Sequence, residues 1–219
     1  MSTGNGKRAG TRLLAVLVLT LVPALSAVSL RAQDRLPPIS PEKLTEAQKK
    51  AAADYKALRG SDLTGPPWAV LLRVPDLTIP VLQMRLHNQN NSALSPKLTE
   101  FAILIAARHW TNNFEWNAHH DAAVKAGLSP EIVAAVADGR RPGRMSQDEE
   151  ILYDFCMELM QNHSVSDPTY DRALAMFGEA GVVEATSLEG YYSFLAILMN
   201  MARSPLPAGA KPALAPFPK

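Results

Sequence analysis

The stretch KLTEFAILIAA, from Lys97 to Ala107, is apolar on nearly every side except at Glu100. A helix that is hydrophobic all round is buried inside a protein, whereas a surface helix keeps a polar face. This stretch therefore predicts the central helix of an all-α bundle.

Signals for helix starts recur along the rest of the chain. Ser40-Pro41, Ser95-Pro96 and Ser129-Pro130 each place a hydroxyl N-cap before a proline at the first helical position, and residues 146–149 (SQDE) form a capping box. Strand signals are nearly absent. The pattern predicts about eight helices, over residues 42–59, 75–89, 96–111, 114–126, 130–137, 147–162, 168–177 and 181–201.

Downstream of the central helix, residues 115–119 read EWNAH. Glu115 and His119 are four residues apart, so on a helix they project from the same face and can form an acid/base pair. If one helix runs through residues 108–119, Arg108 and Asn112 fall on the same stripe. A break at Asn112-Asn113 would undo this alignment.

At these residues the chain resembles the carboxymuconolactone decarboxylase family, which includes the AhpD-type alkylhydroperoxidases. The resemblance rests on LTEFAILIAARHWTNNFEWNAHHDAAVKAGLSPEIVAAVADGRRP, with GPPWAVLLRVPDL before it and DPTYDRALAMFGEAGVVEATSLEGYY after it, and it spans about Leu63 to Met201. It implies an AhpD-like helical bundle of about eight helices over residues 40–202. It also implies a homo-oligomer, either a trimer or a hexamer, and no cofactor.

One departure from the family bears on the reaction. Alkylhydroperoxidase members carry a C-x-x-C-x-x-x-H motif, and with its histidine on His119 the two cysteine positions fall on Asn112 and Glu115. Peroxidase chemistry needs an attacking thiolate and a resolving sulfur. The only cysteine, Cys156, lies in an apolar helical run and is predicted to be a small buried hydrophobe. The resemblance therefore implies acid/base chemistry rather than a thiol-dependent peroxidase.

Three residues are predicted to be catalytic. His119 matches the family histidine and can take and give a proton near neutral pH, although a core histidine tied to Glu115 is the alternative. Glu115 is expected to orient the imidazole, against a purely structural ion pair. Glu100 matches the family's glutamate, and burial in a pocket would make it an acid; an exposed first-turn glutamate is the alternative.

Three further residues are predicted to bind substrate. Arg108 can hold a carboxylate with two hydrogen bonds, or it can pair with one of the glutamates. Asn112 lies on the predicted stripe, and Trp116 is a candidate pocket wall, although aromatic residues at helical spacing are usually core. No metal site is predicted, because the adjacent histidines His119 and His120 diverge on a helix and match no established zinc pattern.

Composition narrows the choice of partners. The 219 residues are 47% hydrophobic, enough for one globular domain, and 22 Lys and Arg balance 21 Asp and Glu. No basic run with interleaved aromatics occurs, so a nucleic-acid partner is not predicted. The expected partners are a small-molecule substrate and further copies of the chain.

The two ends differ from the rest of the chain. Residues 1–32 have a basic start, an apolar run over residues 13–22 and small residues near 24–27, which predicts a signal peptide and a secreted or periplasmic protein that leaves the membrane after cleavage. An uncleaved N-terminal anchor is the alternative. Residues 203–219 carry five prolines and are predicted to be a disordered tail.

The sequence thus leads to two functional hypotheses. The first is a cofactor-free decarboxylase, lyase or isomerase that acts on a small carboxylated lactone or unsaturated acid. The second is a helical oligomer that binds a small apolar acid without catalysis.

Overall fold

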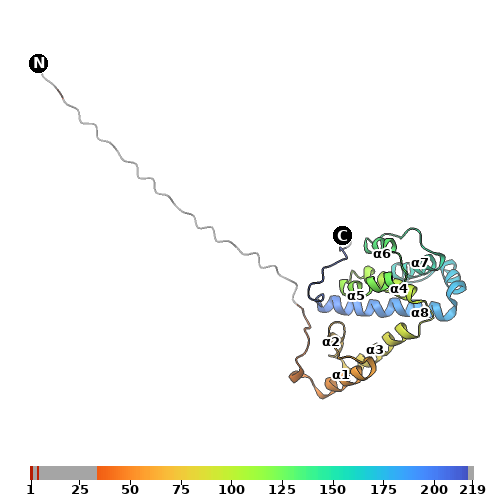
Figure 1. Ribbon diagram of the computed structural model, residues 1–219, viewed down its shortest axis with the longest axis horizontal. Helices are drawn as coiled ribbons and strands as arrows, with labels where there is room; N and C mark the ends of the chain where they lie inside the picture. Colours follow the sequence, from red (N-terminus) through yellow and green to blue (C-terminus); the bar gives the residue numbers. More distant parts are fainter. Residues whose placement is uncertain (2–3, 5–33, 217–219) are drawn as a thin grey trace. The chain divides into compact units, whose positions relative to one another are not determined.

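The computed structural model describes Met1, Gly4 and residues 34–216, and these residues form eight α-helices, one 3-10 helix and no strand (Figure 1). The predicted all-α fold class is therefore confirmed. The predicted signal peptide lies almost entirely outside the described residues. The elements are η1 (Pro41–Lys43), α1 (Glu46–Arg59), α2 (Trp68–Leu71), α3 (Pro75–Asn90), α4 (Pro96–His109), α5 (Asn113–Lys125), α6 (Pro130–Ala137), α7 (Gln147–Asn162) and α8 (Asp167–Ala202).

Local capping starts most of these helices where the sequence predicts. The hydroxyls of Ser95 and Ser129 accept hydrogen bonds from the backbone N–H of the third residue of α4 and α6, and Thr45 and Ser146 complete capping boxes at α1 and α7. Ser40 precedes only a 3-10 turn, and α1 begins after Thr45. Helices α6 and α7 match the predicted ranges.

Two differences concern α2 and α8. The four-residue helix α2 follows a proline pair and is too short to show a periodic pattern. The two helices predicted over residues 168–177 and 181–201 form one element, α8, but its backbone leaves helical geometry at Gly178, with φ 69° and ψ 176°. Glycine has no Cβ and adopts this conformation readily, so the predicted separation is preserved as a kink.

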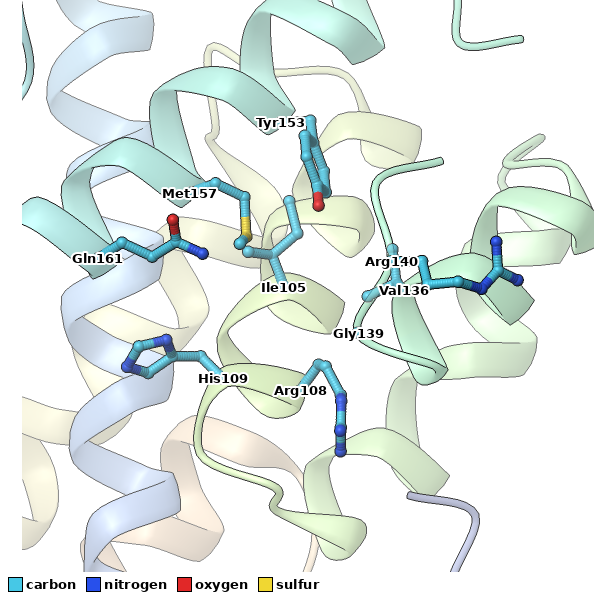
Figure 2. A pocket seen from close by; sticks show the side chains of 9 residues that line it. All are labelled: Ile105, Arg108, His109, Val136, Gly139, Arg140, Tyr153, Met157 and Gln161. Atoms are coloured by element: carbon cyan, nitrogen blue, oxygen red, sulfur yellow. The ribbon is translucent and has the colours of Figure 1, made fainter. Parts of the chain in front are cut away.

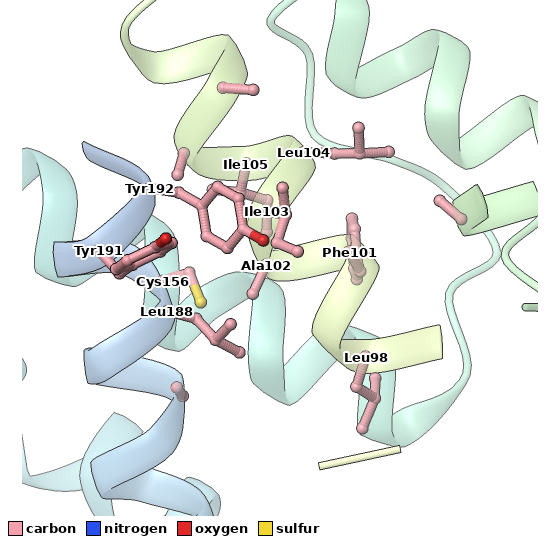
Figure 3. Close-up of a cluster of buried hydrophobic side chains, with 14 of the residues drawn as sticks. Leu98, Phe101, Ala102, Ile103, Leu104, Ile105, Cys156, Leu188, Tyr191 and Tyr192 are labelled. Carbon is pink, nitrogen blue, oxygen red and sulfur yellow. The ribbon is translucent and has the colours of Figure 1, made fainter. Parts of the chain in front are cut away.

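The core is built around α4 and α8. Helix α4 packs against α5, α7 and α8, while α8 also contacts α2 and α3 (Figure 1). Every residue of α4 from Leu98 to Arg108 is buried except Glu100. Side chains from α4, α7 and α8 meet in the apolar cluster of Figure 3. The all-round apolar pattern of the central stretch thus produces a helix with neighbours on every side.

The prediction of a disordered tail is wrong over residues 203–216, which belong to the same compact unit as the helices. Leu214 is 3% exposed, and the Asn113 side-chain oxygen accepts hydrogen bonds from the backbone N–H groups of Ala213 and Leu214, both at 2.8 Å. Arg108 Nη1 donates to the Ala215 carbonyl at 2.7 Å. Side chains of α4 and α5 therefore form hydrogen bonds with backbone groups of the tail. The proline-rich composition of the tail gives no sign of these contacts.

No helix among the described residues has both the length and the apolar content that crossing a membrane would require.

Candidate active site

The chain turns sharply between α4 and α5. Thr111 has a positive φ of 48°, and Asn112, the next residue, is the N-cap of α5. Arg108 and His119 therefore lie on two different helices. The continuous stripe predicted from Arg108 to His119 is wrong, because a left-handed residue between them changes the chain direction.

Asn112, predicted to bind substrate, is a structural residue. Its Oδ1 accepts a hydrogen bond from the Glu115 backbone N–H at 2.9 Å. Its Nδ2 donates to the Ala196 carbonyl at 3.3 Å and to Asn200 Oδ1 at 2.9 Å, both on α8. The side chain is 3% exposed and does not line the cavity beside His119. It fixes the start of α5 and joins it to α8.

We expect Asn112→Ala to lower the free energy of unfolding by about 2 to 4 kcal/mol, because it removes an N-cap and two buried hydrogen bonds. Urea unfolding measures the change. The matched control is Asn162→Ala, an exposed position at the end of α7, which should stay within about 0.5 kcal/mol of the wild type. Equal effects of the two substitutions would contradict the role assigned to Asn112.

His119 lies between two carboxylates. Its Nδ1 is 2.8 Å from Glu100 Oε2, and its Nε2 is 3.5 Å from Glu115 Oε2. Because a carboxylate only accepts, the ring donates its Nδ1 proton to Glu100. The side chains of His119, Glu100 and Glu115 are 9%, 19% and 5% exposed. The structure thus brings together the three residues predicted to be catalytic.

The geometry exchanges the expected roles of the two glutamates. Glu100 makes the short hydrogen bond that fixes the imidazole, the task predicted for Glu115. Burial raises the pKa of Glu115, and the nearby charges of His119 and Arg85 only partly oppose this rise. Glu115 therefore keeps a proton to higher pH than an ordinary glutamate, as an acid requires.

A cavity of about 270 Å³, which we call the histidine cavity, opens beside Glu115 and His119. Its other charged lining residues are Arg59, Asp62 and Arg85. Its aromatic lining residues are Tyr55, Trp68, Phe114 and Tyr192. The Tyr192 ring packs edge-on against the His119 ring, with centroids 5.2 Å apart and planes at 84°. His119 and the buried Glu115 thus share one wall of a polar cavity.

Sequence reasoning missed the cations of this cavity. Arg59 ends α1 and Arg85 lies on α3, both far along the chain from His119. Arg85 is close enough for its charge to lower the pKa of Glu115. No local spacing signal connects these helices to α5, because only tertiary packing brings them together.

Arg108 lies elsewhere. It lines a separate cavity of about 290 Å³, the Tyr153 cavity, together with Ile105 and His109 of α4 and with residues of α6, of α7 and of the loop that joins them (Figure 2). Its guanidinium also holds the tail at Ala215. The predicted placement of Arg108 beside His119 is therefore wrong, because the turn at residue 111 separates the two.

Trp116 and His120 lie on α5, and neither lines the histidine cavity. Trp116 is 2% exposed and belongs to the apolar core, so the predicted wall residue is a core residue. His120 Nδ1 lies 3.0 Å from the Trp116 carbonyl, one turn away on the same helix. The two adjacent histidines diverge as expected for neighbours on a helix.

Cys156 is fully buried, and burial raises the pKa of its thiol well above the usual value. It therefore stays a thiol rather than a nucleophilic thiolate. Within the described part of the chain, no group of three or more His, Cys, Asp or Glu side chains is arranged to hold a metal ion.

Comparison with known proteins gives no relative: the chain matches no protein-family model, and no curated protein matches it. The resemblance to the carboxymuconolactone decarboxylase family stays a prediction from the quoted motifs.

Proposed function

We propose that this protein is a cofactor-free acid/base enzyme of the carboxymuconolactone decarboxylase type, acting on a small carboxylated lactone or unsaturated acid. One observation carries the proposal: His119 is held between Glu100 and Glu115 at the wall of the histidine cavity. Glu100 fixes the Nδ1 side of the ring, and Nε2 faces a second carboxyl group beside open space.

The proposed reaction uses one shared proton. Because Nδ1–H is committed to Glu100, Nε2 is the nitrogen that exchanges a proton with Glu115 and the substrate. When the substrate's carbon–carboxylate bond breaks, its electron pair remains on carbon as an enolate-like anion. That carbon takes the proton shared by Glu115 and His119 and CO₂ leaves. The pair regains a proton from solvent after product release.

Arg85 and Arg59 take the place predicted for Arg108. A positive charge at the cavity wall can bind the substrate carboxylate and stabilise the enolate-like charge as it forms. Arg85 is only half-buried and makes one hydrogen bond, from Nη1 to Gln89 Oε1 at 3.0 Å. Its other N–H groups have no hydrogen-bond partner among the described residues.

Export and assembly belong to the same proposal. Export rests on the pattern of residues 1–32. Assembly rests on the family resemblance, and a row of exposed apolar side chains on α8 supports it: Val183, Phe194, Ile197 and Met201 are 67%, 37%, 45% and 46% exposed.

A substrate screen tests the proposed activity. The mature protein is incubated with small lactones and unsaturated acids that carry a carboxylate, and CO₂ release is followed. Glu115→Gln, which keeps the size of the side chain but removes its acid, serves as the inactive control. Binding of a compound from the screen with no CO₂ release or isomerisation would favour the non-catalytic binding protein instead.

We expect Arg85→Gln to raise the KM for the substrate found by the screen about 10- to 100-fold, because one charge-assisted hydrogen bond contributes about 1.5 to 3 kcal/mol. Steady-state kinetics measures this change. The exposed Arg144 gives the control Arg144→Gln, which should leave KM unchanged. A raised KM in Arg108→Gln but not in Arg85→Gln would show that Arg108, as predicted from the sequence, binds the substrate and that Arg85 does not.

A further inference from the structure

A second polar cavity has Glu100 in its wall. This Asn88 cavity has a volume of about 220 Å³ and polar lining from Asn88, Gln89, Asn90, Ser92, Thr99 and Glu100. Leu94, Pro96, Ile103 and Tyr192 give it apolar walls. Tyr192 also lines the histidine cavity, and the hydrogen bond between Glu100 and His119 connects residues of the two cavities.

The charge in the Asn88 cavity has one sign. Glu100 is its only charged lining residue, and no Lys, Arg or His lines it. Glu100 Oε2 receives the His119 proton, while Oε1 has no hydrogen-bond partner among the described residues. A carboxylate oxygen in a partly enclosed site attracts a cationic hydrogen-bond donor and repels an anion.

Asn88 gives a second, independent indication of a ligand. Its side chain is 2% exposed, and neither Oδ1 nor Nδ2 has a hydrogen-bond partner in the described structure. Buried amides are nearly always hydrogen-bonded. Asn88 and Glu100 line the same cavity, and Asn88 Oδ1 and Glu100 Oε1 both lack a donor within the described residues. Two such acceptors match a ligand with several N–H groups.

We propose that the Asn88 cavity binds a small organic ammonium ion. Its N–H groups donate to Glu100 Oε1 and, once the buried Asn88 side chain turns toward the cavity, to Asn88 Oδ1, while a short alkyl chain packs against Ile103 and Leu94. The cavity has room for about seven water molecules, which suits a ligand of a few carbon atoms rather than a peptide or lipid.

This site goes beyond the proposed function and is coupled to it. Glu100 is shared, because one oxygen holds His119 and the other serves the ammonium ion. A cation at Oε1 draws charge away from Oε2 and weakens the hold of Glu100 on the imidazole. By linkage, if the bound ammonium ion changes the affinity of the histidine cavity for its ligand by some factor, that ligand changes the affinity of the Asn88 cavity for the ammonium ion by the same factor.

Titration with butylammonium tests the site by binding alone, so the outcome does not depend on turnover. The Ile103 methyl signal reports the Asn88 cavity, and the Leu195 methyl signal reports the histidine cavity. We expect Ile103 to shift more than Leu195, with a dissociation constant on the order of 1 mM, as suits so small a ligand. Butanol and butyrate should bind at least about tenfold more weakly, as they lack the charge-assisted hydrogen bond.

Two variants separate the proposed contacts from general packing. Glu100→Gln keeps an acceptor for His119 but removes the charge, and Asn88→Leu keeps the size but removes the amide. Both should weaken butylammonium binding about tenfold or more. Thr64→Val, a similar change in the histidine cavity, should not. The proposal is overturned if butanol binds as tightly as butylammonium, or if the Glu100→Gln variant binds butylammonium as tightly as the wild type. It is also overturned if butylammonium shifts only the Leu195 methyl signal.

Discussion

Replacing His119 with alanine should lower kcat by about a thousandfold, within the 10²- to 10⁴-fold range that positioned acid/base groups contribute. The substitution removes the ring nitrogen that lies 3.5 Å from Glu115 Oε2 and exchanges a proton with it in the proposed reaction, and it leaves two carboxyl groups without the imidazole between them. The measurement is CO₂ release or product formation at saturating substrate. Circular dichroism of the same sample should show an unchanged helical content.

The adjacent histidine supplies the control. His120 lies on the same helix, but its ring faces the Trp116 carbonyl and Asp121 rather than the histidine cavity. We expect His120→Ala to retain kcat within about twofold, the scale of a surface change. Full activity in His119→Ala, or a comparable loss in both variants, would remove His119 from the reaction.

The fold could be predicted because its determinants are local. Ser95 and Ser129 cap helices through contacts three residues away, and Gly178 interrupts α8 by its own backbone conformation. The apolar run from Leu98 to Ala107 indicates burial without knowledge of what buries it. Two features of the fold could not be predicted. Helix α2 is only four residues long, and the docking of the tail depends on contacts between residues far apart in the sequence.

The candidate site could be predicted only in part, for the same reason. Glu115 and His119 meet because they are one helical turn apart, whereas Glu100 is predicted only through the family resemblance. Arg108 was misplaced because the positive φ of Thr111 is not visible in helical periodicity. Arg85 comes from α3, and its approach to α5 depends on packing that no spacing rule encodes.

Another buried carboxyl group lies outside the three named cavities. Glu189 on α8 is 1% exposed, and neither of its oxygens has a hydrogen-bond partner among the described residues. Burial raises its pKa to about 8, and interaction with the Cys156 thiol offsets this rise only in part. The folded protein therefore holds this carboxyl neutral at pH 7, whereas the unfolded chain ionises it near pH 4.5.

This difference sets the sign of a pH dependence. Below pH 4.5 the carboxyl is neutral in both states and causes no penalty. Between pH 4.5 and about 8 only the unfolded state releases the proton, so the free energy of unfolding falls by about 1.4 kcal/mol per pH unit. Above about pH 8 both states are ionised, and the penalty stays constant at several kcal/mol.

We therefore expect Glu189→Leu to stabilise the protein, by little at pH 5 and by roughly 4 kcal/mol more at pH 8. Urea unfolding of both proteins at the two pH values measures the difference, in which contributions from other groups, including the raised pKa of Glu115, cancel. Glu189→Gln is the matched control: it removes the titration but keeps a buried polar group without a partner, so it should abolish the pH-dependent part while stabilising less than leucine. A difference between Glu189→Leu and the wild type that is the same at pH 5 and pH 8 would show that Glu189 is not held neutral in the core.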